Sequence, residues 1–366
     1  MKKITVFLNA YSQGISGADK ICIETWKRIP GHAVTCITSQ NGKKMCEQLE
    51  FNCNFKITTT ESEFRNPILT YLKRIFLGIW IAIISPKQDI LYSSSDQLPD
   101  ILPAFVMHLK NSHAKWIVRS YHKIPLSRRI SHIAQKLSWF IMSRFSATII
   151  TASSVMEKEL LQYGFPSENI HIVYPGIIKV KISIKQRILK PYDAVFVSRL
   201  HESKGILELI NIWKNVTQEF PHATLGIIGT GDTQIVQKLH EKMKKHNLTK
   251  SISLLGYLSD KEVAHYVSSS KVFIFPSHEE GFSLTIAEVL FLGTPIVTYD
   301  LPIFQDIFPD AFIPVPCFNS KMFSNKVIDV LGSPKKYQET LALGKKINKK
   351  YSWKNAIEKE RIILDL

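Results

Sequence analysis

Two carboxylates flank an expected helix start in the segment 275–297, FPSHEEGFSLTIAEVLFLGTPIV. They are Glu280 and Glu288. A short apolar run before them predicts a strand, and the apolar positions after them predict a helix over about 283–292 that ends at Gly293. The N-terminus of a helix presents free N–H groups and a partial positive charge, so this one is suited to bind a phosphate.

A carboxylate facing a diphosphate would be repelled, so the two glutamates must contact another part of such a ligand. Sugar and ribose hydroxyls are hydrogen-bond donors, and an ionised carboxylate accepts two of them at once. Taken alone, each glutamate is more often a surface residue. Their position in a loop that contains Gly281 favours a site that binds a sugar nucleotide.

The cations that such a ligand needs occur in a second segment, 195–210, VFVSRLHESKGILELI. Arg199 follows an expected strand, and Lys204 stands just before an expected helix. Arginine offers a planar fork for phosphate oxygens, and lysine offers a mobile point charge. Two basic residues in a loop are usually only solvated, but together with the glutamate loop they form a coherent donor site.

Strands alternating with amphipathic helices must position these loops. The alternation predicts parallel sheets wound with helices, whose ligands bind at the carboxyl ends of the strands. The pattern restarts after an irregular basic stretch at 179–192, which indicates two α/β domains in a chain of 366 residues. Strands are expected within 3–8, 33–38, 89–94, 115–120 and 147–153, and then within 193–198, 223–231, 251–257, 271–277 and 294–300.

These motifs resemble the retaining glycosyltransferases of family 4. The resemblance lies in Arg199, in Lys204 followed by glycine, and in the glutamates of the 275–297 segment, and it continues in LGIIGTGD and in the closing YSWKNAIEKERI. It covers nearly the whole chain. The fold that it implies is GT-B, with two Rossmann-like α/β domains whose parallel sheets face each other across a cleft.

The resemblance also implies a division of labour between the domains. Residues 1–175 would form an N-terminal Rossmann-like domain that binds the acceptor, and a C-terminal helix at 352–366 would pack back on it. Residues 176–192 would form a linker. Residues 193–351 would form the C-terminal Rossmann-like domain that binds the nucleotide-sugar donor.

Roles for single residues follow from the resemblance. Arg199 and Lys204 would bind the donor diphosphate, Glu280 would contact the transferred sugar, and Glu288 would bind the ribose. Together with His122, the first three form the implied catalytic set. The other implied donor-binding residues are Gly281, Phe282, Ser283, Leu284, Tyr257, Leu258, Gly229, Gly231, Gly14 and Gly17.

Two N-terminal motifs depart from the family pattern. The family's first glycine-rich loop appears as GISGADK, which contains Gly14 and Gly17. The family more often has two adjacent glycines in this loop, and Ser16 replaces one of them here. His122 matches a histidine that the family often follows with aspartate, but Lys123 follows it here. A histidine at a strand end is more often a surface or packing residue, so its role depends on the resemblance.

The activity that the resemblance implies is that of a hexosyltransferase-type glycosyltransferase (EC 2.4), which acts with retention of anomeric configuration. 

No Asp-x-Asp motif and no His/Cys metal spacing occurs in the chain, so the reaction is expected to run without a metal. The expected donor substrate is a nucleotide-diphosphate sugar, and no bound cofactor is expected.

The acceptor is expected to be a saccharide or a lipid-linked saccharide of cell-envelope polysaccharide, lipopolysaccharide or glycolipid synthesis. Two alternatives remain open: an epimerase of sugar nucleotides with the same fold, and a non-catalytic subunit that binds sugar nucleotides.

The net charge of +16 is unevenly distributed. Residues 1–185 contain 24 basic and 12 acidic side chains, whereas residues 186–366 contain 23 and 19. This excess predicts an anionic partner such as a membrane surface, although diffuse charge that serves solubility explains it equally well. A nucleic-acid partner is not expected, because no recognisable nucleic-acid-binding motif accompanies the charge.

The expected location is the cytoplasm, with peripheral attachment to the inner face of the cytoplasmic membrane. Five cysteines without paired spacing indicate reduced thiols. The N-terminal apolar run is short and predicts a strand in place of a signal peptide. The longest apolar run, 75–84, is about half of what a bilayer span needs.

Overall fold

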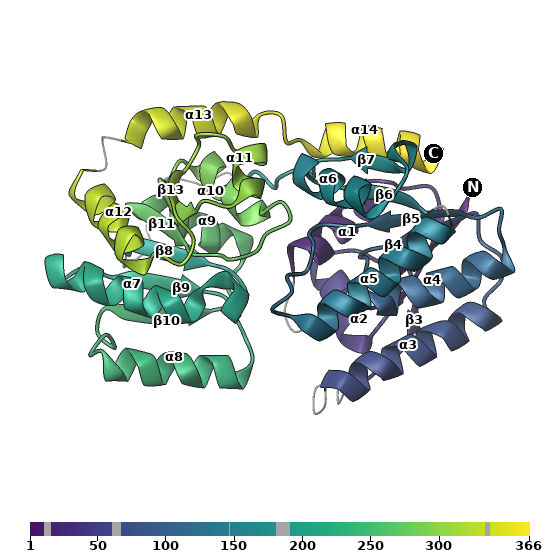
Figure 1. Ribbon diagram of the computed structural model, residues 1–366, viewed down its shortest axis with the longest axis horizontal. Coiled ribbons are helices and arrows are strands. Elements are labelled where there is room, and N and C mark those ends of the chain that lie inside the picture. Colours follow the sequence, from purple (N-terminus) through teal and green to yellow (C-terminus); the bar gives the residue numbers. More distant parts are fainter. Residues whose placement is uncertain (11–15, 61–66, 146, 181–190, 334–336) are drawn as a thin grey trace. The chain divides into compact units, whose positions relative to one another are not determined.

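The computed structural model describes residues 1–10, 16–60, 67–145, 147–180, 191–333 and 337–366, and Figure 1 shows its helices and strands. The chain forms two compact units. The first unit consists of Met1–Pro175 with Trp353–Leu366, and the second consists of Gly176–Ser352. Gly14 and positions 181–190 of the expected linker lie outside the described residues.

The first unit contains a parallel sheet of seven strands in the order β3-β2-β1-β4-β5-β6-β7. Its strands are β1 (Lys3–Leu8), β2 (Ala33–Thr38), β3 (Asn54–Ile57), β4 (Ile90–Ser93), β5 (Lys115–Arg119), β6 (Thr148–Thr151) and β7 (Ile170–Ile172). Its helices are α1 (Gly17–Lys27), α2 (Gln40–Gln48), α3 (Pro67–Ile84), α4 (Leu98–Lys110), α5 (Arg129–Arg144), α6 (Ser154–Tyr163), the short 3-10 helix η2 (Ser167–Asn169) and α14 (Trp353–Leu364).

Helices cover both faces of this sheet, as its apolar strands require. Alternate strand residues point to opposite faces, so Val6 packs with α1, α2 and α14, whereas Phe7 packs with α3, α4, α5 and α6. The C-terminal helix α14 contributes Ile357 and Leu364 to the first of these cores. The last helix of the chain is therefore part of the first unit, although more than half of the sequence separates it from α1.

The second unit contains a parallel sheet of six strands in the order β10-β9-β8-β11-β12-β13. Its strands are β8 (Ala194–Val197), β9 (Leu225–Ile228), β10 (Ile252–Gly256), β11 (Val272–Phe275), β12 (Ile296–Tyr299) and β13 (Ile313–Val315). Its helices are η3 (Glu202–Lys204), α7 (Ile206–Glu219), α8 (Thr233–Lys245), α9 (Asp260–Ser269), α10 (Leu284–Leu292), α11 (Pro302–Ile307), α12 (Ser320–Gly332) and α13 (Gln338–Asn348).

All ten strands expected from the sequence are present, and both sheets are parallel. Three further strands, β3, β7 and β13, were not expected from the sequence. Each lies at an edge of its sheet and contains only three or four residues. Short edge strands carry little of the apolar pattern that identifies a buried strand, which explains why the sequence did not indicate them.

The departure at Ser16 has a structural reason in the first unit. Ser16 caps the N-terminus of α1, because its side chain accepts a hydrogen bond from the backbone N–H of Asp19 at 3.2 Å. The Asp19 carboxylate accepts the backbone N–H of Ser16 in return, at 3.0 Å. This reciprocal pair is a capping box, which a glycine at position 16 could not form.

Candidate functional site

The loops that carry Lys204 and Glu280 follow two neighbouring strands, β8 and β11. The strand order also reverses here, because β9 and β10 lie on one side of β8 while β11, β12 and β13 lie on the other. Open parallel sheets bind ligands at the carboxyl ends of their strands where the order reverses. The topology therefore brings both loops to the edge of the sheet that is best suited to a ligand.

Lys204 and Glu280 form an ion pair within this edge, with 2.8 Å between Nζ and Oε1. Lys204 Nζ also donates to the backbone oxygen of Glu279 at 3.0 Å. The hydroxyl of Ser277 donates to the same Glu280 oxygen at 2.9 Å. Only 10% of the Glu280 side chain is exposed, so its carboxylate is held in a defined position by one cation and one hydroxyl.

Direct backbone contact joins the two loops. The N–H of His278 donates to the backbone oxygen of Ser203 at 2.9 Å. Gly205 lies so close to the other loop that a Cβ on it would stand 2.0 Å from the backbone oxygen of Pro276. Gly205 also has a φ of +67°, which disfavours any residue with a Cβ. Glycine at this position is therefore required for the loops to meet.

Replacing Gly205 by alanine should lower the free energy of unfolding by about 3 kcal/mol, because the new Cβ meets backbone and adopts a strained φ. Gly256 is a matched control, since its φ is +68° but nothing lies within 4 Å of its Cβ position. Gly256→Ala should cost only the strain, about 1 kcal/mol. Urea denaturation measures both. Equal losses in the two variants would show that the contact with Pro276 is unimportant.

The Gly-x-Gly loop after β9 lies against the loop that carries Arg199. A Cβ on Gly229 would stand 1.8 Å from the backbone oxygen of Ser198, and one on Gly231 would stand 2.5 Å from that of Leu200. Both glycines thus have a packing role that the structure shows directly. Their contact with a donor stays a prediction.

The helix expected over 283–292 is confirmed as α10, and Gly293 ends it in the left-handed conformation. Ser283 is its N-cap and accepts a hydrogen bond from the N–H of Ile286 at 3.4 Å. Ser283 has a φ of +66°, which is uncommon for a residue other than glycine. Strained residues of this kind cluster at binding sites, where the surrounding structure holds them.

Phe282 and Leu284 beside this cap are buried. The Phe282 ring packs edge-on against Tyr351 at 5.2 Å and against Phe308 at 5.7 Å. Its side chain therefore belongs to the core of the second unit. Any contact of Phe282 with a ligand would therefore have to use its backbone.

The remaining predicted donor residues of the second unit are distributed around the same edge of the sheet. Arg199, Gly281, Glu288 and Leu258 are half-buried, and 68% of Tyr257 is exposed. Tyr257 and Leu258 follow β10, two strands away from β8, which corresponds to about 10 Å across the sheet. Gly17 and His122 belong to the first unit.

Two family models match the chain. The model described as Glycosyltransferase Family 4 matches residues 27–178, and the model described as Glycosyl transferases group 1 matches residues 179–346. Between them they cover most of both units. The chain belongs to glycosyltransferase family 4.

Two known proteins are similar to this chain over part of its length. Glycogen synthase of Mycobacterium tuberculosis is 27% identical over 192 residues, which are 52% of this chain and 44% of its own length. An uncharacterised glycosyltransferase of Methanocaldococcus jannaschii is 30% identical over 271 residues, which are 67% of this chain and 64% of its own length. The chain thus spans about half the length of the first of these relatives.

A solved structure shows the fold of this family 4 chain. The crystal structure of Anabaena HepE in complex with UDP superposes with a TM-score of 0.79 at 16% identity, and the match covers 100% of each chain. The expected GT-B fold, with its two parallel α/β sheets, is confirmed.

His122 lies in a segment that is held in place by two residues the sequence analysis missed. Gln135 donates to the backbone oxygen of His122 at 2.9 Å and accepts the N–H of Ile124 at 2.8 Å. The same amide donates at 2.9 Å to Asp96, which is buried. Gln135 and Asp96 stand on different elements, so no local sequence signal could have connected them.

A second missed group supports the glutamate loop of this family 4 chain. The Glu208 carboxylate accepts hydrogen bonds from Ser320 at 2.5 Å and from Tyr299, and it pairs with His278 at 3.0 Å. Burial opposes its ionisation, but these partners together hold the pKa of Glu208 below its ordinary value. Glu208 therefore anchors the His278 side chain, whose backbone joins the two loops.

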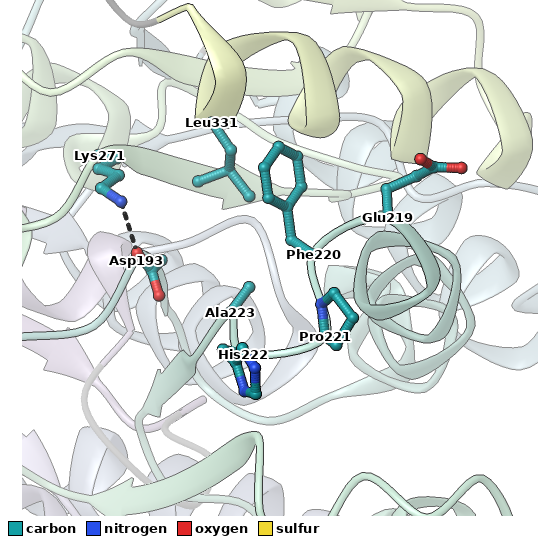
Figure 2. Close-up of a pocket in the computed structure, with 8 residues that line it drawn as sticks. All are labelled: Asp193, Glu219, Phe220, Pro221, His222, Ala223, Lys271 and Leu331. Atoms are coloured by element: carbon teal, nitrogen blue, oxygen red, sulfur yellow. Dashed lines mark ion pairs between the residues drawn. The ribbon is translucent and has the colours of Figure 1, made fainter.

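A pocket of about 260 Å³ lies elsewhere in the second unit (Figure 2). Asp193 and Lys271 line it and form an ion pair at 2.8 Å. These residues precede β8 and β11, so the pocket is at the amino ends of the strands whose carboxyl ends carry the candidate site. Its position separates it from Lys204 and Glu280, and we assign it no part in donor binding.

Proposed function

We propose that this protein transfers a hexosyl group from a nucleotide-diphosphate sugar to an acceptor hydroxyl, with retention of anomeric configuration. The ion pair between Lys204 and Glu280, at the loops after β8 and β11, is the observation that carries the proposal. A diphosphate needs cations and N–H donors, and a hexose needs acceptors for its hydroxyls. This edge of the second unit presents both, because α10 begins directly after the glutamate loop.

The basic residues of the site would stabilise the diphosphate as it leaves the sugar. As the bond between the anomeric carbon and the diphosphate oxygen breaks, that oxygen gains negative charge. Arg199, Lys204 and the N-terminal amides of α10 would stabilise this charge without having to reorganise. The acceptor oxygen bonds to the anomeric carbon on the same face, and its proton passes to the leaving diphosphate, so the step needs no nucleophile from the protein.

The two glutamates would hold the two sugars of the donor. Lys204 and Ser277 both contact Oε1 of Glu280, so Oε2 of the same carboxylate is suited to accept a hydroxyl of the transferred hexose. Glu288 lies one turn inside α10 and would accept the ribose hydroxyls. The ribose hydroxyls that Glu288 would bind change little during the reaction, whereas the hexose that Glu280 would bind changes charge and geometry.

Glu280→Gln should lower kcat by about a hundredfold with little change in KM, because it removes an interaction that strengthens in the transition state. Glu288→Gln should mainly raise KM, by about tenfold, since uniform binding is lost. Steady-state kinetics on the best donor measure both, and Glu219→Gln, beside the pocket of Figure 2, is the control. If both glutamine variants altered only KM, the assignment of Glu280 to the transferred sugar would be wrong.

We also propose that the acceptor is a saccharide or a lipid-linked saccharide of envelope polysaccharide, lipopolysaccharide or glycolipid synthesis, and that the first unit binds it. The excess of basic side chains in residues 1–185 supports an anionic or membrane-bound acceptor. His122 and the helix that begins at Gly17 follow strands of that unit at their carboxyl ends, where a ligand is expected.

The direct test is a screen of uridine, guanosine and adenosine diphosphate sugars. Thermal stabilisation identifies the bound donor, and slow hydrolysis of the donor identifies the transferred sugar. HepE was crystallised with UDP-glucose, so this donor should be tried first. Failure of every donor to stabilise the protein would overturn the proposal. Epimerisation of the donor without glycoside formation would replace it with an epimerase.

A further inference from the structure

The layer of helices α3, α4 and α5 exposes large apolar side chains in an unusual number. Of the 19 exposed large apolar side chains among the described residues, 13 lie between positions 68 and 140. We call them the α3–α5 surface. They are Ile68, Leu69, Leu72, Phe76, Trp80, Ile83, Ile84, Leu109, Leu126, Ile130, Ile133, Leu137 and Phe140.

Eleven of these side chains form two stripes, one on α3 and one on α5. In both α3 and α5 they recur every three or four residues, which places them on one side of the helix. The other side is apolar as well, because Ala82 of α3 and Trp139 of α5 lie in the core against the sheet. Figure 1 shows α4 between the two helices.

Three of the side chains in the stripes are aromatic. Phe76 is 69% exposed, Trp80 is 60% exposed and Phe140 is 60% exposed. Soluble monomers rarely expose contiguous apolar patches of more than a few hundred Å², and larger ones mark interaction sites. The α3–α5 surface therefore indicates a partner.

The charges around the stripes are of one sign. The segment 101–156 contains eight Lys and Arg residues and no Asp or Glu, and α3 contains two basic residues and no acidic one. The exposed cations include Lys73, Arg129, Lys136 and Arg144, which lie on the two helices that carry the stripes. A partner must therefore be both apolar and anionic.

We propose that the α3–α5 surface docks this protein on an anionic lipid bilayer. Phe76 and Trp80 enter the boundary between headgroups and acyl chains, and the exposed cations of α3 and α5 contact the headgroups. A bilayer matches both features over a wide area, because anionic lipids attract basic groups and the interface favours aromatic rings. None of the described helices is long and apolar enough to cross a membrane. The inference deepens the proposed function by naming the surface at which a lipid-linked acceptor is met.

Vesicle flotation of the full chain tests the docking. The protein should float with phosphatidylcholine vesicles that contain about 30% phosphatidylglycerol and not with phosphatidylcholine alone. Binding should fall sharply at about 0.5 M salt, which screens the charges. The double variant Phe76→Ser/Trp80→Ser and the double variant Arg129→Glu/Lys136→Glu should each lower partitioning at least about tenfold.

Matched controls come from exposed residues on other surfaces. Ile362 is 72% exposed on α14, so Ile362→Ser removes a comparable apolar side chain. Lys245→Glu reverses a charge on α8 of the second unit. Neither control should change the partitioning. Equal partitioning onto neutral and anionic vesicles, or equal losses in the controls, would overturn the proposal.

Bromine-labelled lipids locate the contact. They should quench the fluorescence of Trp80 on binding, and the variant Trp80→Phe should still bind but lose this quenching. Sedimentation could instead show a dimer that the variant Phe76→Ser/Trp80→Ser dissociates. If that dimer had no affinity for vesicles, the surface would bind a second copy of the chain and the lipid proposal would be overturned. Transfer to a water-soluble acceptor should stay normal in all of these variants, so failed docking and failed transfer can be distinguished.

Discussion

Replacing Lys204 or Arg199 by alanine should slow sugar transfer about a hundredfold, which corresponds to about 3 kcal/mol in the barrier. Under the proposed function, each variant would remove a charge-assisted contact from a diphosphate whose charge grows as the sugar leaves. Lys204→Ala should have the larger effect, because Lys204 also positions Glu280 through their 2.8 Å ion pair.

The measurement is a steady-state comparison on the best donor, with folding checked by thermal melts. Lys238→Ala is the matched control, since Lys238 pairs with Glu202 of the same loop at 3.1 Å but is 56% exposed. Its activity should stay within about twofold of the unmodified protein, as expected for an exposed ion pair. Near-normal transfer by the folded Lys204 and Arg199 variants would remove the donor site from this edge of the sheet.

Glu360→Ala should destabilise the first unit by about 3–5 kcal/mol, because it leaves a buried cation without its partner. Glu360 of α14 pairs with Arg119 of β5 at 2.5 Å, and their side chains are 0% and 1% exposed. Tyr92 donates to the same carboxylate at 2.5 Å. Burial would lower the pKa of Arg119, but the facing carboxylate holds it well above its ordinary value. Arginine side chains are effectively always protonated in proteins, so the guanidinium stays charged when Glu360 is lost.

Urea denaturation followed by tryptophan fluorescence measures this change, since five of the six tryptophans belong to the first unit. The exposed pair of Lys115 and Asp365 is the control, and Asp365→Asn should cost less than about 1 kcal/mol. The double variant Arg119→Met/Glu360→Leu should recover most of the loss, because an apolar pair needs no compensation. A loss in the double variant as large as in Glu360→Ala would show that packing of α14, and not the charge, is responsible.

Local sequence determined the interior strands and the ends of the site helix. The apolar runs predicted ten strands because strands buried on both faces must be apolar throughout. Ser283 and Gly293 marked the ends of α10 because capping depends on the residue type at single positions. The edge strands β3, β7 and β13 were missed because they contain only three or four residues, whereas the edge strand β10 contains five and was predicted.

The candidate site was predictable in its residues and not in its contacts. The sequence indicated Lys204 and Glu280 from their loops, but they are 76 positions apart, and only the neighbouring positions of β8 and β11 bring them within 2.8 Å. The contact of Ser277 with Glu280 is local, because the two residues are only three positions apart in the same loop. The support from Glu208 depends on Ser320, which is 112 positions away, so it required the folded second unit.

The tertiary structure alone decided which faces of the helices are covered. Helix α3 is apolar on nearly every side, and its sequence could not show whether the stripe of Phe76 and Trp80 faces the core or solvent. The pairing of Glu360 with Arg119, 241 positions apart, was equally hidden. Patterns of a few residues determine strands, caps and loop chemistry because those depend on neighbours along the chain. Burial, ion pairing and outward-facing surfaces depend on which distant segments the sheet order brings together.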